Sequence, residues 1–354
     1  MAVSMADIAA RAGVSATTVS YALSGKKSVS VEARRRVMQA VQELGYRPHA
    51  AARALASRRS RTIALVVPPL GRGLVATQLE FVSAVAEEAS QHDHDLLLAV
   101  SGDGTENMTR LIQEGVVDGL IVMEVLLEDP RVELLRRQDV PFVLVGRPAD
   151  TAGLRYVDAD TDAMVHRAVR HLVDLGHRDV ALVNLPDHLL EIGYAPAVRA
   201  LNAYRSACAT HGLTPWAAGC DTTLDATAAC VDLLLSQRPA TTALLTNNDD
   251  AVAGLISALH ATGRGVPDDV SLVAVIGPTR AAQLTRPPVT VIELPTHDLA
   301  TTATRHLITA LNATPTHQPA SPPAGILFDP PLTPGHTTTY PPARPERASD
   351  DAAG

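Results

Sequence analysis

Cysteine is scarce in this chain, with 3 residues among 354. The three thiols, Cys208, Cys220 and Cys230, form no C-x-x-C pair. Their number and spacing exclude the dense disulfide framework of small secreted domains and the paired cysteines of a zinc ribbon. We therefore expect reduced and mostly buried thiols, as in a cytosolic protein.

Long apolar runs are absent as well. No stretch approaches the roughly 20 apolar residues that span a bilayer, so no membrane partner is expected. The chain starts with the pattern of a capped helix rather than a basic segment leading into an apolar run, so no signal peptide is expected. The tail from residue 314 onward contains no leucine heptads, which argues against a tetramer-forming coiled coil there. No Ser-His-Asp order and no paired carboxylates indicate catalysis.

The N-terminal residues carry the pattern of a helix-turn-helix. Ser4 and Asp7 have capping-box spacing at the start of one helix, and Gly13 suits the left-handed position that ends it. Ser15 can then cap a second helix over residues 16–23. Four side chains are left for the outer face, where a recognition helix meets base edges: Ala16, Thr17, Ser20 and Tyr21.

A third helix is predicted after Ser30, which can act as its N-cap. Three arginines, at 34–36, crowd one end of it, and alone such a run is equally consistent with a solvated helix face. Residues 1–61 contain eleven Lys and Arg against three Asp and Glu, a formal charge of +8, whereas the whole chain carries −8. Residues 62–354 therefore carry −16. A basic head on an acidic body indicates that the head contacts DNA phosphates.

Three N-terminal segments follow one known pattern: MADIAARAGVSATTVS at 5–20, VSVEARRRV at 29–37 and LGYRP at 44–48. On these residues the head resembles the LacI/GalR family of bacterial transcriptional regulators. Looser likeness continues to about residue 338, for example in HLVDLGHR at 171–178 and NDDAVAG at 248–254. The resemblance implies the fold class, an N-terminal all-α helix-turn-helix domain plus a hinge helix, followed by an α/β two-lobed periplasmic-binding-protein-like core.

The resemblance divides the chain into four parts. A helix-turn-helix DNA-binding domain takes 1–47, and a hinge helix or linker takes 48–60. A two-lobed core for effector binding and dimerisation takes 61–338, and a Pro/Ala-rich tail at 339–354 is expected to be disordered.

The family also implies how the head meets double-stranded operator DNA. The second helix would enter the major groove, with seven residues available to bases and phosphates: Ser15, Ala16, Thr17, Ser20, Tyr21, Ser24 and Ser28. The hinge alone is too short to stay helical in water and is equally consistent with a flexible linker. The family implies that it pairs with its twin in the minor groove, where Leu55 is an apolar wedge. The hinge contacts would come from Ala51, Ala52, Arg53 and Leu55.

From residue 61 onward the pattern changes to apolar strands separated by helices. Strands are predicted in a first round at 62–68, 95–100, 119–123 and 142–145, and in a second round at 179–183, 243–246, 271–276 and 290–292. Continuous apolar strands alternating with helices indicate parallel sheets covered on both faces. The resemblance implies that these two lobes close on a small effector.

Two short motifs suggest other chemistry. The loop GRGLVA at 71–76 fits the G-x-G-x-x-A nucleotide fingerprint, but a lone match is weak, and a loop facing the cleft explains it as well. The run HDHD at 92–95 could bind a metal, but a solvated turn is favoured, since no cysteine and no third spaced histidine supports a site. We expect neither a cofactor nor a metal.

The effector cleft departs from the family pattern at two polar positions. The Asp that relatives place after a late strand is replaced by Ile276 and Gly277. Ala200 takes the position of their pocket Arg, and Arg199 lies one residue early. A sugar held in the usual way would leave polar groups unpaired, at about 1–3 kcal/mol each, so the sequence disfavours it. Six charged residues remain as candidates for effector binding: Arg72, Glu124, Arg147, Asp158, Arg199 and Asp249.

These patterns predict a sequence-specific DNA-binding transcriptional regulator, interpreted as a repressor. It is expected to bind a palindromic operator as a homodimer, to respond to a small-molecule effector, and to work in the cytoplasm on the nucleoid. Two alternatives stay open. The α/β core alone would suit a solute-binding protein, and a nucleotide-dependent α/β enzyme would use the loop at 71–76.

Overall fold

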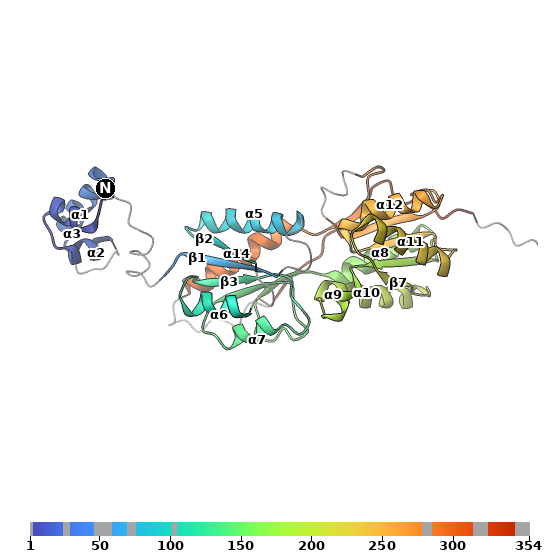
Figure 1. Ribbon diagram of the computed structural model, residues 1–354, viewed down its shortest axis with the longest axis horizontal. Coiled ribbons are helices and arrows are strands. Elements are labelled where there is room, and N and C mark those ends of the chain that lie inside the picture. The colour runs from blue at the N-terminus through green and yellow to red at the C-terminus, as the bar shows by residue number, and fades with distance from the viewer. Residues whose placement is uncertain are drawn as a thin grey trace, which may run out of the picture.

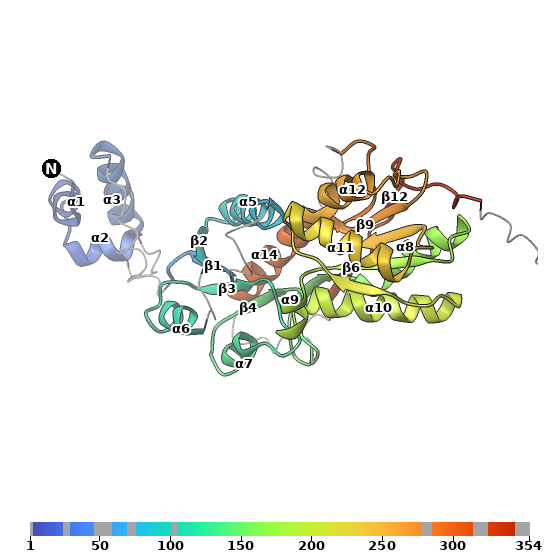
Figure 2. The same ribbon diagram turned by 45° about the vertical axis from the view of Figure 1, so that its right-hand side comes forward.

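The computed structural model describes residues 3–23, 29–45, 59–68, 76–100, 105–277, 285–313 and 325–343. Three short helices at the N-terminus form a body of their own, and two α/β lobes follow (Figure 1, Figure 2). The helices are α1 (Met5–Ala12), α2 (Ala16–Leu23) and α3 (Val31–Glu43). An all-α head before a two-lobed α/β core confirms the predicted fold class, while the hinge lies outside the described residues.

The first lobe is built on a six-stranded parallel sheet in the order β11-β5-β4-β3-β1-β2. Its strands are β1 (Thr62–Val67), β2 (Asp95–Val100), β3 (Gly119–Val122), β4 (Phe142–Val145), β5 (Tyr156–Ala159) and β11 (Ile326–Phe328). Successive strand residues point to opposite faces. Ile63 and Leu65 therefore pack on the side of α5 (Ala76–Gln91) and α14 (Thr296–Asn312). Ala64 and Val66 pack on the side of α6 (Thr105–Gln113) and α7 (Pro130–Arg136).

The second lobe repeats this arrangement, with a sheet in the order β12-β10-β9-β8-β6-β7. Its strands are β6 (Val180–Asn184), β7 (Ala217–Gly219), β8 (Ala243–Thr246), β9 (Ser271–Gly277), β10 (Thr290–Glu293) and β12 (Leu332–Thr333). Strand β12 runs antiparallel to β10, and the others are parallel. Leu182 faces α8 (Thr161–Asp174) and α10 (Ala195–His211), whereas Val183 faces α11 (Leu224–Gln237) and α12 (Val252–Ala261).

The chain passes between the lobes three times. Strand β5 of the first lobe leads into α8 of the second, and α14, which follows β10, packs back beside α5 in the first lobe. Strands β11 and β12 then join different sheets. All the predicted strands are present, but the sequence pattern did not indicate this exchange, nor the short strands β5, β7, β11 and β12. Three links between two bodies suit closure over a cleft.

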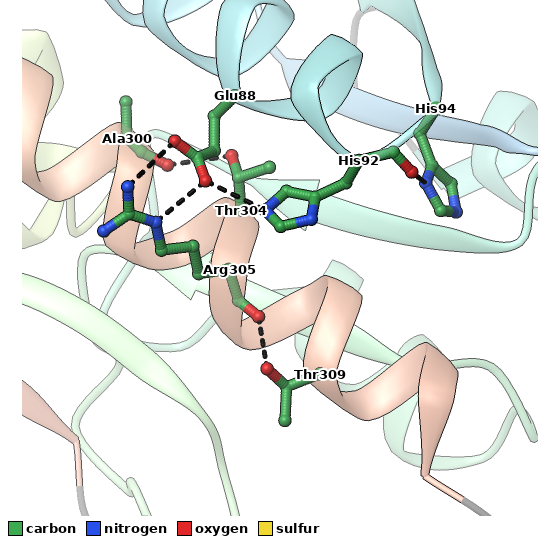
Figure 3. A network of polar contacts seen from close by, with 7 residues as sticks. All are labelled: Glu88, His92, His94, Ala300, Thr304, Arg305 and Thr309. Carbon is green, nitrogen blue, oxygen red and sulfur yellow. Dashed lines mark hydrogen bonds and ion pairs between the residues drawn. The ribbon is translucent and has the colours of Figure 1, made fainter.

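A buried carboxylate ties α5 to α14 in the first lobe (Figure 3). Glu88 on α5 is 5% exposed, and its two oxygens accept hydrogen bonds from Nε and Nη2 of Arg305 at 2.8 and 3.2 Å. Nε2 of His92 lies 3.1 Å from the Glu88 Oε1. The guanidinium of Arg305 is the main reason that the pKa of Glu88 lies below its ordinary value. The contact fastens a helix from late in the sequence to one from early in the sequence.

Replacing Arg305 with Ala is expected to lower the free energy of unfolding at neutral pH by more than the loss of a fully exposed ion pair, because Glu88 stays buried without its main cation. Because the folded protein lowers the pKa of Glu88, this stabilisation is present above the ordinary carboxyl pKa and is lost as the pH falls through the lowered value. The free energies of unfolding of the variant and the parent protein should therefore become equal in acid. Urea unfolding followed by circular dichroism measures it. Arg110→Ala breaks an exposed pair with Glu114, and this control should lose no more than about 0.5 kcal/mol. If both variants lose the same free energy of unfolding, the contact between Glu88 and Arg305 contributes no more than an exposed ion pair.

The segment 325–343 packs on the second lobe as well as contributing to both sheets. Thr337 is fully buried, and its hydroxyl donates to the carbonyl of Leu272 at 2.6 Å. The N–H of Thr339 donates to the hydroxyl of Ser271 at 3.0 Å. This contact lies one residue beyond the boundary predicted at 338, and residues 344–354 of the tail lie outside the described residues.

The three cysteines are free and buried, as expected for reduced thiols. In the run HDHD at 92–95, Asp93 has a left-handed φ of 57° in the turn between α5 and β2. Among the described residues, no three His, Cys, Asp or Glu side chains are grouped as a metal ion would require. Within the same residues no helix combines the length and apolar character needed to cross a membrane.

Candidate functional site

Local capping contacts build the N-terminal helix-turn-helix. The Ser4 hydroxyl accepts the N–H of Asp7 at 3.3 Å, and the Asp7 carboxylate accepts the N–H of Ser4 at 2.8 Å, which closes the predicted capping box. Gly13 ends α1 with φ of 63°, where glycine is unstrained. Ser15 accepts the N–H of Thr18 at 3.1 Å and so caps α2. These contacts set the direction in which α2 leaves the turn.

A small apolar core holds α2 against its neighbours. Ile8, Val19 and Val37 are fully buried, one from each helix. The opposite side of α2 faces solvent, with Ser20 half-buried and three side chains exposed: Ala16, Thr17 and Tyr21. A helix that packs on the domain core with one face and leaves the opposite face exposed has the geometry of a recognition helix.

A cleft of about 520 Å³ lies between the two lobes. The carboxyl ends of strands in open α/β sheets are the usual place for ligand sites, and the strand ends of both sheets contribute here. Five of the six predicted effector residues line the cleft: Glu124, Arg147, Asp158, Arg199 and Asp249.

Glu124 follows β3 with a left-handed φ of 55°, a strained conformation for a residue other than glycine. Its carbonyl accepts Nη2 of Arg131 at 2.8 Å. Arg131 is 3% exposed and is itself held by Asp129, with Nε at 3.0 Å from Oδ1. The Glu124 carboxylate accepts Nε2 of Gln78 at 2.8 Å and the hydroxyl of Tyr194. Contacts at both ends thus hold the strained residue and fix its carboxylate in the cleft.

Arg147 and Arg199 bring positive charge into the cleft from the two lobes. Nη1 of Arg147 lies 3.0 Å from the carboxylate of Asp158, and Nη2 of Arg199 donates to the carbonyl of Pro148 at 3.1 Å. Burial raises the pKa of Asp158 to about 6, although Arg147 opposes the shift. Nε of Arg199 is buried without a partner among the described residues. Two guanidiniums and one carboxylate leave this part of the cleft with net positive charge.

Polar contacts bridge the lobes at the cleft. The hydroxyl of Thr77 donates to the carboxylate of Asp249 at 3.2 Å, and the Tyr194 hydroxyl donates to Glu124. Burial, followed by the nearby Glu124 carboxylate, raises the pKa of Tyr194 well above its ordinary value, so the phenol keeps the proton that it donates. The segments meet at main-chain level too, where Leu126 and Tyr194 form an antiparallel bridge. A molecule in the cleft would touch both lobes.

Asn247 is a cleft residue that was missed in the sequence. It is 4% exposed, and neither Oδ1 nor Nδ2 has a partner among the described residues. Its neighbour Asn248 is satisfied, since Nδ2 donates to the carbonyl of Cys220 at 2.7 Å. A signal was available, because the polar run 247–250 directly follows the buried strand β8.

Two family models match the chain. Residues 4–49 match the bacterial regulatory proteins of the lacI family, and residues 169–338 match the periplasmic binding protein-like domain. The HTH-type transcriptional regulator AglR of Rhizobium meliloti (strain 1021) is 34% identical over 290 residues, 77% of this chain and 78% of AglR. The chain belongs to the LacI family of bacterial transcriptional regulators.

Other proteins match this LacI-family regulator over more of its length. The HTH-type transcriptional regulator CelR of Thermobifida fusca is 31% identical over 311 residues, 85% of this chain and 89% of CelR. A solved CelR–cellobiose complex has a TM-score of 0.69 at 28% identity and covers 95% of this chain and 99% of its own. The lac repressor dimer bound to operator and the anti-inducer ONPF has a TM-score of 0.79 at 22% identity, over 96% and 100%, and shows the same fold.

Family membership decides between the functional alternatives. LacI-family proteins are DNA-binding transcriptional regulators and not enzymes, so this LacI-family regulator is a DNA-binding protein. The nucleotide-dependent enzyme is excluded, and the solute-binding alternative fails to account for the matched DNA-binding domain at 4–49.

Several predicted contact residues of this LacI-family regulator lie outside the described residues. They are Ser24, Ser28, Ala51, Ala52, Arg53, Leu55 and Arg72. The nucleotide-like loop at 71–76 is outside as well, apart from the backbone of Ala76 at the start of α5. The side chain at Ile276, one of the two departures from the family pattern, is not described either.

Proposed function

We propose that this regulator is a repressor that binds a palindromic operator as a homodimer, in the cytoplasm on the nucleoid, under control of a small molecule in the inter-lobe cleft. The single observation that carries the proposal is the exposed face of α2 on a head with a formal charge of +8. Positive charge supplies affinity for phosphates, and the outward side chains of α2 supply sequence readout.

In this proposal α2 lies in the major groove. Thr17 and Tyr21, both exposed, would contact base edges together with Ala16. Hydroxyls at the start of α2 and beyond it would bind bases or phosphates: Ser15, Ser20, Ser24 and Ser28. The hinge at 48–60 would enter the minor groove at the centre of the operator, with Leu55 as the wedge and Ala51, Ala52 and Arg53 beside it.

Apolar side chains at equivalent sheet edges support the homodimer. Strand β2 is an edge strand of the first sheet, and Leu98 and Val100 on it are 38% and 47% exposed, with Leu79 on α5 at 50%. Strand β7 is the corresponding edge of the second sheet, and on the neighbouring α11 Leu224 and Leu233 are 71% and 45% exposed. Apolar residues gathered on edges of both lobes favour a second copy as their partner. A two-fold dimer would bring two heads to one operator.

The cleft supports control by an effector. Contacts such as Thr77 with Asp249 and Glu124 with Tyr194 already span the lobes, so a ligand that replaces or reinforces them would change the balance between open and closed states. That balance sets the separation of the segments that lead to the two heads. The effector would then change operator affinity by its differential affinity for the two states.

Selection of bound sequences from random duplexes tests the function. We expect enrichment of one palindrome, because a two-fold dimer reads the same half-site twice. Variants of exposed α2 residues should change which bases are enriched, and Thr17→Ala is the first to make. The matched control is Thr210→Ala, an exposed threonine at the far end of α10, which should leave the selected sequence unchanged. Enrichment of no palindrome would overturn the proposal.

A further inference from the structure

The second-lobe wall of the cleft is acidic. Asp221, Asp249 and Asp250 line it, and none of the three forms an ion pair with another described residue. Asp249 is the least exposed of them. Burial, reinforced by the Asp250 carboxylate, raises the pKa of Asp249 to about 6. At neutral pH the wall therefore holds negative charge that the described side chains do not neutralise.

Asn247 lies on the same wall with an unsatisfied amide. It is 4% exposed, and both its donor and its acceptor lack a partner among the described residues. A buried polar group without a partner is destabilising, and native structures complete such groups with a water or a ligand. A ligand that accepts and donates hydrogen bonds next to Asp249 would satisfy it.

The two arginines of the cleft interact with groups other than the acidic wall. Arg147 pairs with Asp158 at 3.0 Å, and Arg199 donates to the carbonyl of Pro148 at 3.1 Å. Each guanidinium stabilises the ionised carboxylate of Asp158 rather than the carboxylates of the acidic wall. The cleft thus has one part where two guanidiniums outweigh one carboxylate, and another where the carboxylates of Asp221, Asp249 and Asp250 have no cationic partner among the described residues.

We propose that the effector carries a primary amine whose ammonium group binds against Asp249 and Asp250, while Asn247 hydrogen-bonds a neighbouring polar group of the same molecule. The inference rests on the proposed function, in which the cleft holds the effector. An ammonium group brings three donors and one positive charge to the carboxylates. A neutral sugar brings donors but leaves the charge of the wall uncompensated. The cleft volume of about 520 Å³ admits an amino sugar or a short diamine.

Matched pairs of probes test the amine. Full-length protein is titrated calorimetrically with glucosamine and glucose, galactosamine and galactose, and putrescine and 1,4-butanediol. We expect at least one amine to bind, about tenfold or more tighter than its neutral counterpart. Asp249→Asn should remove that preference. Asp232→Asn, an exposed carboxylate on α11 that does not line the cleft, should keep it.

Two results would overturn the amine assignment: a neutral probe that binds as tightly as its amine, or no binding by any amine. The selection of operator sequences does not depend on the amine probes. The proposed function as a DNA-binding regulator can therefore be supported even if the amine assignment is wrong. The free protein gives a second measurement. Asp249→Asn should raise its thermal midpoint by about 2 °C, because a carboxylate with no cationic partner among the described residues becomes a neutral amide. A lower midpoint would also overturn the assignment.

Discussion

Replacing Val19 with Asp is expected to weaken operator binding severely. Val19 is fully buried among apolar side chains of the three N-terminal helices, including Ile8 and Val37. A carboxylate placed there has no cation to pair with in that cluster, and burying it destabilises the head by several kcal/mol. A core this small supplies no more than about 3–5 kcal/mol, so the head should unfold. We expect operator affinity to fall by a factor of about 100 or more, measured by fluorescence anisotropy.

Val31→Asp is the matched control for this variant. Val31 is 88% exposed at the first position of α3, where the helix dipole favours a negative charge. The substitution adds the same charge to the same head without entering the core. Operator affinity should stay within a few-fold of the parent, and the α/β core should unfold at an unchanged temperature in both variants. Equal losses of affinity would mean that added charge, rather than unfolding of the head, prevents binding.

The head was predictable because its signals are local. Ser4, Asp7, Gly13 and Ser15 act on neighbours within four residues, and each makes the capping contact that its spacing predicts. The buried position of Val19 follows from helical spacing in the same way. Nothing in these elements depends on distant parts of the chain.

The strands of the α/β core were predictable, but the passage of the chain back and forth between the two lobes was not. Apolar runs such as 62–67 and 180–184 identify buried parallel strands, because both faces of such strands are covered. Helix α14 has the same kind of amphipathic pattern whichever sheet it covers. Its return to the first lobe depends on long-range contacts, such as that between Glu88 and Arg305, which no local pattern contains.

The cleft residues that could be predicted from the sequence are charged side chains that directly follow apolar strands. Glu124, Arg147 and Asp249 follow apolar strands, and all three were among the charged residues predicted for the cleft. Asn247 was missed because its importance lies in having no partner among the described residues, and recognising this requires the positions of its neighbours. Tyr194 was missed because it reaches Glu124 from the other lobe, 70 residues away in sequence.

Operator affinity is expected to fall by about three orders of magnitude when the salt concentration rises from 50 to 200 mM. The head carries a formal charge of +8, and the proposed dimer brings two heads to one operator. Each phosphate neutralised by Lys or Arg releases counterions, and six or more contacts give a slope of about −5 or steeper for log affinity against log salt. Residues 62–354 carry −16 and repel DNA, so they do not supply this attraction.

The salt slope can be assigned to the head with two arginine variants. Arg35 is exposed on α3, in the run of three arginines, and Arg205 is exposed on α10 of the second lobe. Arg35→Ala should make the slope shallower by about 2 in a dimer, since one phosphate contact is lost from each head. Arg205→Ala changes the net charge by the same amount and should leave the slope as it is. If Arg205→Ala instead reduces the slope as much as Arg35→Ala, or if the parent slope is shallower than about −2, contact of the head with phosphates is not the source of affinity. Binding would then have to come from base contacts by α2, and the basic run on α3 would be a solvated face.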